Sequence, residues 1–193
     1  MQLQLSRNST TNTVLSIPDG RPLYHIYTPG PLLRKTSFIY KIPETNVQRY
    51  EGVEKMTEVV PNQEEEIARI HWHLLHSSKL IWDEKTLEMK KFLESKGFWG
   101  RARIFTGPDG KNYKWNMGWL TSYLELDDAS EAPKRVAELH QGNFLKGKKS
   151  VLEIDESVLF MQDLIIITFI FVETRRRDRE KRRQASMASG GGP

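Results

Sequence analysis

Apolar and polar residues alternate in short runs through most of the first 155 residues. Successive side chains of a strand point to opposite faces of a sheet, so this period of two is typical of half-buried strands. In one such run, Ala68, Ile70 and Trp72 fall on one face, which we expect to lie in the core. Strands predicted in this way cover residues 2–5, 13–17, 23–27, 36–42, 66–75, 79–82, 119–126, 135–140 and 150–154.

Turn-forming residues separate these runs. Asp109-Gly110 accepts left-handed backbone dihedrals and lies between two alternating segments, which predicts a β-hairpin over residues 103–115. A second turn is expected at residues 18–20, which read Pro-Asp-Gly. Evenly spaced strands with no regular alternation of strand and helix favour an antiparallel sheet, sandwich or barrel over a doubly wound fold.

Two segments depart from the strand pattern. In residues 84–95, Leu87, Met89 and Leu93 can share part of one helix face, and we expect a helix there. Residues 158–172 are apolar on nearly every side. This second segment is either a helix buried all round or a buried central strand, and a helix wrapped by the sheet explains why every face is apolar.

The apolar segment is a poor candidate for crossing a membrane. As a helix it would be about 22 Å long, short of the ~30 Å hydrocarbon core. Asp163 near its start would add roughly 2.5 to 3.5 kcal/mol if it lay deep in the bilayer. We therefore expect no transmembrane segment.

Composition and charge narrow the class of protein. With 38% hydrophobic, 28% charged and 10% aromatic residues, the chain is neither a fully buried membrane protein nor a disordered one. Residues 173–183 hold seven basic and three acidic residues, so the other residues carry 22 of each and the net charge of +4 lies in this stretch. A body without net charge argues against a nucleic-acid-binding surface spread over the fold.

Candidate chemistry is sparse. The chain has no cysteine, and its start has no apolar run of the kind that marks a secretory signal, so we expect a cytoplasmic or nuclear location. No nucleophile elbow, phosphate-binding loop, dinucleotide fingerprint or zinc-protease motif is present. We therefore expect no catalytic residues, no cofactor and no enzyme activity.

Three groups of residues have both a functional and a structural interpretation. His71 and His73, with His76 close behind, have a spacing that suits zinc, but no fourth ligand is identified and solvent-facing histidines explain them equally well. The acidic runs 64–66 and 127–128 lack the spacing of a calcium loop. Alternating aromatic residues that could stack on bases are more often core, and they are Tyr113, Trp115, Trp119 and Tyr123.

A basic run follows the apolar segment. It is a solvated helix end, a nuclear-import or nucleic-acid patch, or an anchor at an anionic membrane, and the interleaved Asp178 and Glu180 weaken the last two interpretations. Its candidate contacts to an anionic lipid or a partner are Arg175, Arg176, Arg177, Arg179, Lys181, Arg182 and Arg183.

Several segments together resemble a domain family of unknown function that is abundant in mushroom-forming (basidiomycete) fungi, over roughly residues 1–177. The segments are Pro22-Leu-Tyr-His-Ile-Tyr-Thr-Pro29, Ile67-Ala-Arg-Ile-His-Trp72, Arg103-Ile-Phe105, Asp109-Gly-Lys-Asn-Tyr-Lys-Trp115, Val136-Ala137, Leu152-Glu-Ile154 and Asp163-Leu-Ile-Ile-Ile-Thr-Phe-Ile-Phe-Val-Glu-Thr-Arg175. That family has no assigned activity, so the resemblance carries no catalytic residues.

The order of elements is also similar, more distantly, to the Tubby C-terminal and LURP-one-related fold. In that fold a closed antiparallel barrel surrounds a central hydrophobic helix. Tubby-like relatives bind phosphoinositides through basic residues on the barrel, and scramblase-like relatives are membrane-associated. The resemblance thus implies a closed barrel here, and an anionic lipid as one class of partner.

We therefore predict a mainly β fold, a closed antiparallel barrel or sandwich around a hydrophobic C-terminal helix with a charged helical extension. The domain should cover residues 1–174, with its core helix at about 157–174, before a basic and then disordered tail at 175–193. The expected function is that of a non-enzymatic, intracellular binding or scaffold module. The first alternative is a phosphoinositide- or anionic-membrane-binding module, and the second is a hydrolase or lipid-modifying enzyme.

Overall fold

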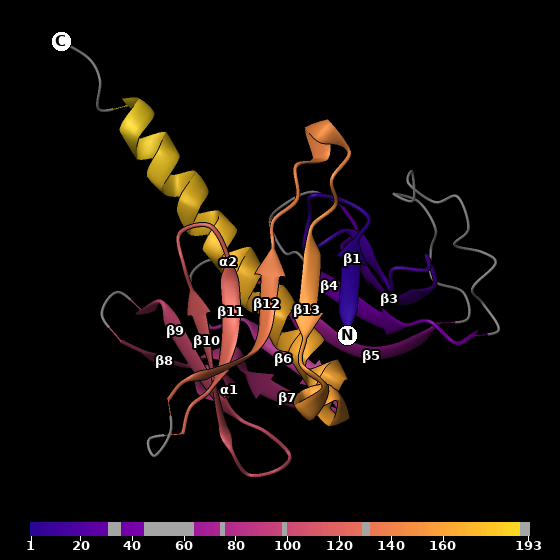
Figure 1. Cartoon of the computed structure of the whole chain (residues 1–193). Helices are drawn as coiled ribbons and strands as arrows, with labels where there is room; N and C mark the ends of the chain where they lie inside the picture. Colours follow the sequence, from indigo (N-terminus) through magenta and orange to yellow (C-terminus); the bar gives the residue numbers. More distant parts are fainter. Residues whose placement is uncertain (31–35, 45–63, 74–75, 98–99, 129–131, 190–193) are drawn as a thin grey trace.

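The computed structural model describes residues 1–30, 36–44, 64–73, 76–97, 100–128 and 132–189 of the chain (Figure 1). In these residues thirteen strands form one antiparallel sheet, in the spatial order β7-β6-β5-β4-β3-β2-β1-β13-β12-β11-β10-β9-β8. The strands are β1 (Gln2–Leu5), β2 (Thr13–Ser16), β3 (Pro22–Tyr27), β4 (Thr36–Lys41), β5 (Glu65–His71), β6 (Lys79–Trp82), β7 (Lys85–Glu88), β8 (Glu94–Lys96), β9 (Ala102–Thr106), β10 (Asn112–Met117), β11 (Ser122–Leu126), β12 (Lys134–His140) and β13 (Val151–Ile154). The helical elements are α1 (Met89–Phe92), η3 (Phe144–Lys146), η4 (Glu156–Met161) and α2 (Gln162–Ser189).

The predicted strands are all present. The largest differences are at β5, which ends at His71, and at β11, which begins at Ser122, while residues 74–75 of the predicted strand lie outside the described residues. Ala68 and Ile70 are buried, as the alternation predicts. The hairpin is confirmed as well, with Gly110 at φ 76° in its turn and Tyr113 opposite Phe105.

The predicted helix over residues 84–95 is wrong apart from one turn, α1. Asp83 and Glu84 both adopt positive φ, which makes a tight two-residue connection between β6 and β7. Leu87 then lies opposite Leu80 in the antiparallel β6–β7 pair instead of sharing a helix face with Met89 and Leu93. Tertiary strand pairing therefore overrides the helical spacing of these residues.

The sheet is strongly curved but not closed. β1 pairs with β13, with Leu3 opposite Leu152, and this pairing joins the first half of the sheet to the second. The two edges are β7 and β8, which follow each other in the chain and are linked through α1 instead of a ladder of hydrogen bonds. The expected closed barrel is thus corrected to an open sheet, with a gap at the place where α1 lies.

The apolar segment forms the helix α2, not a strand, and the sheet wraps around it (Figure 1). Residues 164–172 are buried, with exposed fractions of at most 4%. The second half of the sheet holds the helix through Trp115, whose Nε1 donates to Thr168 Oγ1 at 2.9 Å. On the other side Trp72, just after β5, stacks on Phe171 with ring centroids 5.5 Å apart. The helix is therefore the core element of the fold.

Asp163 lies at the entrance of this helix into the sheet and is paired. The Tyr24 hydroxyl donates to its carboxylate, and Lys41 Nζ lies 3.0 Å from Asp163 Oδ2. Burial and the neighbouring Asp163 raise the pKa of Tyr24 well above its usual range, so Tyr24 stays a proton donor. The one acidic residue of the apolar run thus anchors the helix to β3 and β4.

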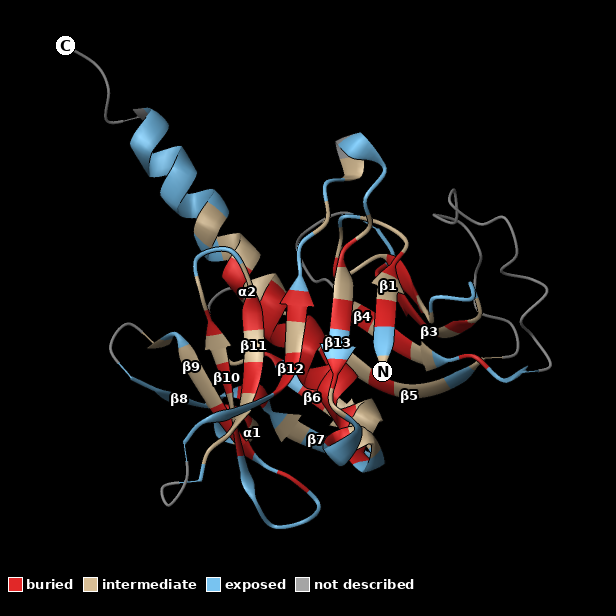
Figure 2. Cartoon of the chain, in the orientation of Figure 1, coloured by how far each residue is buried: buried red, intermediate tan, exposed pale blue. Residues whose placement is uncertain are grey.

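The helix does not end at residue 174. It continues to Ser189, so residues 185–189, which we expected to be disordered, are helical, and residues 190–193 lie outside the described part. Figure 2 shows the buried positions of α2 inside the sheet and the exposed ones beyond it. By length and hydropathy the segment Glu156–Ala188 could span a membrane, but 67% of its most apolar stretch is buried in this fold.

Candidate functional site

The end of the sheet where α2 emerges carries most of the basic run, and the structure divides that run into groups with different partners. Arg176 and Arg177 are bound to Glu173, a fully buried carboxylate. Arg176 Nε lies 2.7 Å from Glu173 Oε2, and Arg177 Nε lies 2.7 Å from Oε1. Ser122 Oγ donates a further hydrogen bond to Glu173 at 2.9 Å. Arg176 and Arg177 are thus paired with a carboxylate of their own helix, and Ser122 connects that carboxylate to β11.

A second group surrounds Trp119, in the turn between β10 and β11. The guanidinium carbons of Arg101 and Arg183 lie 4.3 and 5.0 Å from the Trp119 ring centroid. Arg183 also pairs with Glu180 on its own helix at 3.0 Å. Arg176 Nη1 donates to the Trp119 backbone carbonyl at 3.1 Å, so the turn is held against α2.

This turn exposes apolar surface. Trp119 is 59% exposed and Leu120 is 79% exposed. Tyr113 and Trp115 are buried, as predicted for core aromatics, but Trp119 is not, because β10 ends at Met117 and the alternation stops there. The core expectation is therefore wrong for Trp119.

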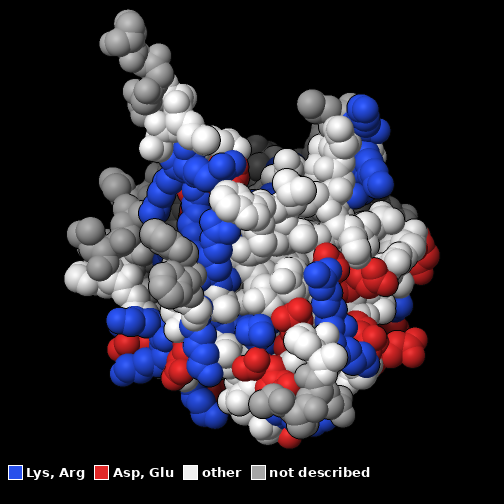
Figure 3. All heavy atoms as spheres, turned by 60° about the vertical axis from the view of Figure 1, so that its left-hand side comes forward, with Lys and Arg blue, Asp and Glu red and all other residues white. Residues whose placement is uncertain are grey.

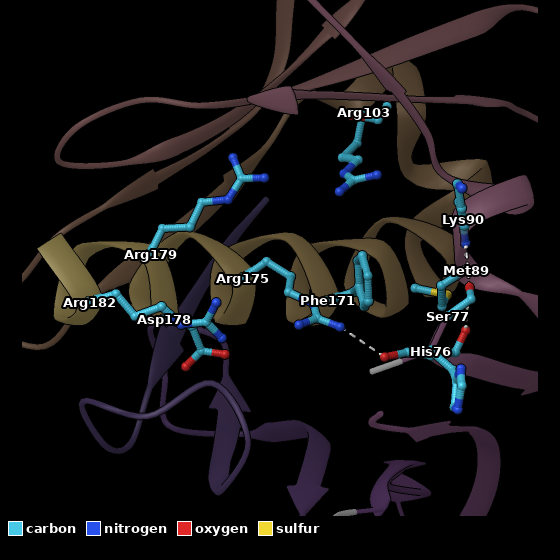
Figure 4. A pocket seen from close by; sticks show the side chains of 12 residues that line it. His76, Ser77, Met89, Lys90, Arg103, Phe171, Arg175, Asp178, Arg179 and Arg182 are labelled. Carbon is cyan, nitrogen blue, oxygen red and sulfur yellow. Dashed lines mark hydrogen bonds between the residues drawn. The ribbon is translucent and has the colours of Figure 1, made fainter. Parts of the chain in front are cut away.

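The third group, Arg175, Arg179 and Arg182, lines a pocket of about 510 Å³ (Figure 4). The pocket lies between α2 on one side and, on the other, residues 76–78 before β6, the α1 turn, β8 and β9. Its other lining residues are His76, Ser77, Ser78, Met89, Lys90, Ser95, Arg103, Phe171 and Asp178. Five basic side chains and one acidic side chain thus face the same space.

The charges of this pocket are held in place by the fold. Arg175 Nη2 donates to Ser78 Oγ at 3.0 Å, and its guanidinium lies over the rings of Trp72 and Phe171. Burial, and then the neighbouring Arg179 and Arg175, lower the pKa of Arg103. Burial also lowers the pKa of Arg175 and of Arg179. The pocket therefore holds several cations in a partly desolvated, mutually repelling arrangement.

The surface charge is unevenly distributed. On the face drawn in Figure 3, Lys and Arg side chains form a band in the upper part, while most acidic side chains lie lower down, where they are mixed with further Lys and Arg. Net charge from the sequence could not show this separation.

The other sequence candidates are accounted for by structure. His71 Nδ1 lies 2.8 Å from Thr36 Oγ1, and no group of three or more His, Asp or Glu side chains in the described ranges is placed to hold a metal ion. Glu64 is buried beside His25, with 3.2 Å between its Oε2 and the ring nitrogen. Asp127 lies 3.4 Å from Lys114 Nζ.

Comparison with known proteins decides the family. A model of a family of unknown function (DUF6593) matches residues 8–178 of the chain. The chain belongs to this family. The DUF6593 match includes every strand of the sheet except β1, and it includes Arg103 and Arg175 of the pocket but not Arg179 or Arg182. No curated protein and no solved structure matches the chain significantly.

Sequence reasoning missed two of the five basic residues that line this pocket. The basic run pointed to Arg175, Arg179 and Arg182, but Lys90 and Arg103 lie in the unremarkable segments that fold as α1 and β9. Only the folding of β9 and α1 around α2 brings them to the same pocket. No spacing in the sequence carries that information.

Proposed function

We propose that the chain is a non-enzymatic binding module that docks on anionic membrane surfaces with the end where α2 leaves the sheet. The main support for this proposal is that Trp119 and Leu120 are 59% and 79% exposed beside the basic residues of α2. Tryptophan and leucine at the tip of a turn suit the membrane interface, and flanking Lys and Arg are attracted to anionic headgroups.

The proposal narrows the lipid-contacting residues. Arg176 and Arg177 are engaged by Glu173, so the basic contribution comes from exposed residues further along the helix, such as Lys181 and Arg182. The Trp119 turn adds an apolar contribution that the basic run alone lacks. The docking surface is thus the Trp119–Leu120 turn together with the exposed part of α2.

The proposal also covers the cellular location of the protein and its distant relatives. It includes an intracellular location, cytoplasmic with access to the nucleus, and a distant relation to the Tubby and LURP-one folds. That relation is supported by the element order, a β-rich body followed by an Asp-led apolar helix. The link to mushroom-forming fungi rests on the sequence motifs alone.

The enzyme alternative has little to support it. In the described contacts, Ser77 and Ser78 accept hydrogen bonds from backbone amides and from Arg175, and neither hydroxyl donates to a histidine side chain that could act as base. Activation of a serine nucleophile needs such a base within hydrogen-bond reach. We therefore keep binding, not catalysis, as the proposed activity.

Co-sedimentation with vesicles tests the docking. Full-length protein should bind phosphatidylcholine vesicles that contain phosphatidylserine, with loss of binding as salt rises, and should not bind phosphatidylcholine alone. The double variant Trp119→Ser/Leu120→Ser should bind roughly tenfold more weakly, which corresponds to about 1.4 kcal/mol.

Phe160→Ser is the matched control, because Phe160 is also 59% exposed but precedes the other end of α2. It should bind like the unchanged protein. No binding by the unchanged chain, or equal losses in both variants, would contradict the proposal and direct the search to an acidic protein partner.

A further inference from the structure

The pocket beside α2 differs from the docking surface because it is recessed and enclosed by separate parts of the fold. Arg103 comes from β9, Lys90 from α1, and Arg175 and Arg179 from α2. In Figure 4 the guanidinium groups of Arg103 and Arg179 approach each other from β9 and α2. A volume of about 510 Å³ is in the range of small-molecule sites.

Arg103 and Arg175 of the pocket lack the carboxylates that neutralise other arginines nearby. Arg176, Arg177 and Arg183 each form an ion pair with a glutamate at 2.7 to 3.0 Å. Arg103 and Arg175 form no ion pair in the described part of the chain, although both lie against the fold.

Arg103 is the clearest case. Its Nε is buried and has no hydrogen-bond partner among the described residues, and its Nη1 makes only a long contact of 3.4 Å to the Leu93 carbonyl. A buried guanidinium that keeps an unsatisfied N–H costs free energy unless an acceptor comes to it. Arg103 lines the pocket, so a ligand bound there can supply that acceptor.

We propose that this pocket binds a ligand with closely spaced phosphate groups, and that Arg103, Arg175 and Arg179 are its anion-binding side chains. Guanidinium groups match phosphate oxygens in pairs of hydrogen bonds. Five basic side chains against Asp178 leave an excess of four positive charges, which two phosphate groups of −1.5 to −2 each would balance. A single carboxylate would not.

This inference deepens the proposed function, because both place an anion at the same end of the molecule, but it is tested without vesicles. Tripolyphosphate is the soluble probe, titrated calorimetrically into the full-length protein at fixed ionic strength, with sulfate as the comparison. Saturable binding of tripolyphosphate that exceeds sulfate binding at least tenfold is expected. Equal, weak binding of both anions would overturn the proposal.

Two variants test the residues. Arg103→Gln should weaken tripolyphosphate binding at least tenfold, and Arg179→Gln, an exposed position, gives the same test without risk to the core. Arg135→Gln is the control, because Arg135 pairs with Glu138 and lies over Tyr123, away from the pocket. Equal weakening by Arg135→Gln would show a diffuse charge effect and would contradict the assignment.

Vesicles then distinguish a lipid headgroup from a free phosphate compound as the source. If Arg103→Gln removes a preference for phosphoinositide vesicles over phosphatidylserine vesicles, the headgroup occupies the pocket. If the unchanged protein shows no such preference but binds tripolyphosphate, the ligand is soluble. Tripolyphosphate binding without any vesicle binding would support the phosphate-binding pocket and contradict the membrane-docking proposal. Vesicle binding without tripolyphosphate binding would support membrane docking and contradict the phosphate-binding pocket.

Discussion

Glu173 marks the boundary between the apolar and the charged parts of α2. Its carboxylate is fully buried, yet both oxygens are satisfied by Arg176, Arg177 and Ser122. The pairs Glu173–Arg176 and Glu173–Arg177 are spaced i,i+3 and i,i+4, so they form as soon as the helix does. The same spacing was visible in the sequence, but burial of the carboxylate was not.

Glu173→Gln should destabilise the protein by about 3 to 5 kcal/mol, because it leaves the buried Arg176 without a counter-charge. Urea unfolding followed by tryptophan fluorescence measures this loss. Glu180→Gln is the control on the same helix, since the Arg183–Glu180 pair is exposed, and it should change stability little. Equal effects of the two substitutions would refute the anchoring role of Glu173.

Trp115 and Trp119 show that the burial of a side chain cannot be predicted from the alternation of residues alone. Both follow the alternation of the segment, but Trp115 is fully buried against α2 and Trp119 is largely exposed. The difference depends on the end of β10 at Met117, and strand ends are set by pairing with partners elsewhere in the chain. Arg103 is a second case, because its role depends on α2, about 70 residues later.

Among the elements, α2 is the one on which the fold depends most. Ile166→Asp places an unpaired charge at a position with 0% exposure, at a cost of several kcal/mol against a total stability of about 5 to 15 kcal/mol. Soluble expression should therefore be lost. Met187→Asp, on the same helix at 68% exposure, should express and melt like the unchanged protein. A cooperatively folding Ile166→Asp protein would mean that the sheet does not need this helix.

The β9–β10 hairpin depends on its turn residue. Gly110 has φ 76°, and a side chain there would meet no neighbouring atom, so any penalty comes from the backbone alone. Gly110→Val should cost about 1 to 2 kcal/mol, while Gly110→Asn should cost less because asparagine tolerates left-handed dihedrals. Thermal denaturation of the two variants compares them directly, and an unchanged melting temperature for Gly110→Val would contradict this account.

Elements defined by local signals were predictable, and those defined by distant partners were not. The hairpin and most strands follow from turn residues and alternation within a few residues. The segment 84–95 failed because Leu87 pairs with Leu80 across a tight turn. The helical end of α2 was missed because residues 185–189 were grouped with the glycines that follow, although Ala185, Met187 and Ala188 favour a helix and continue one already formed.

At the scale of the whole molecule, the class of fold was predictable but its closure was not. The pattern predicted an antiparallel, β-rich body in which the apolar segment is either a buried helix or a buried strand. The open edges at β7 and β8, and the pocket beside α2, depend on how the thirteen strands of the described residues share one curved sheet. The band of basic side chains on one face has the same origin, since it follows from the positions of residues in space and not from their number.

The core helix follows all the strands of the described sheet along the chain, and this order has a consequence for how the fold forms. The strands emerge from the ribosome first, with apolar faces that have nothing to pack against until residues 164–172 follow. β1 must also wait for β13, about 150 residues later, before its second neighbour exists. The sheet can therefore be completed only after residues 151–172 have been synthesised, and until then its apolar faces are exposed to aggregation.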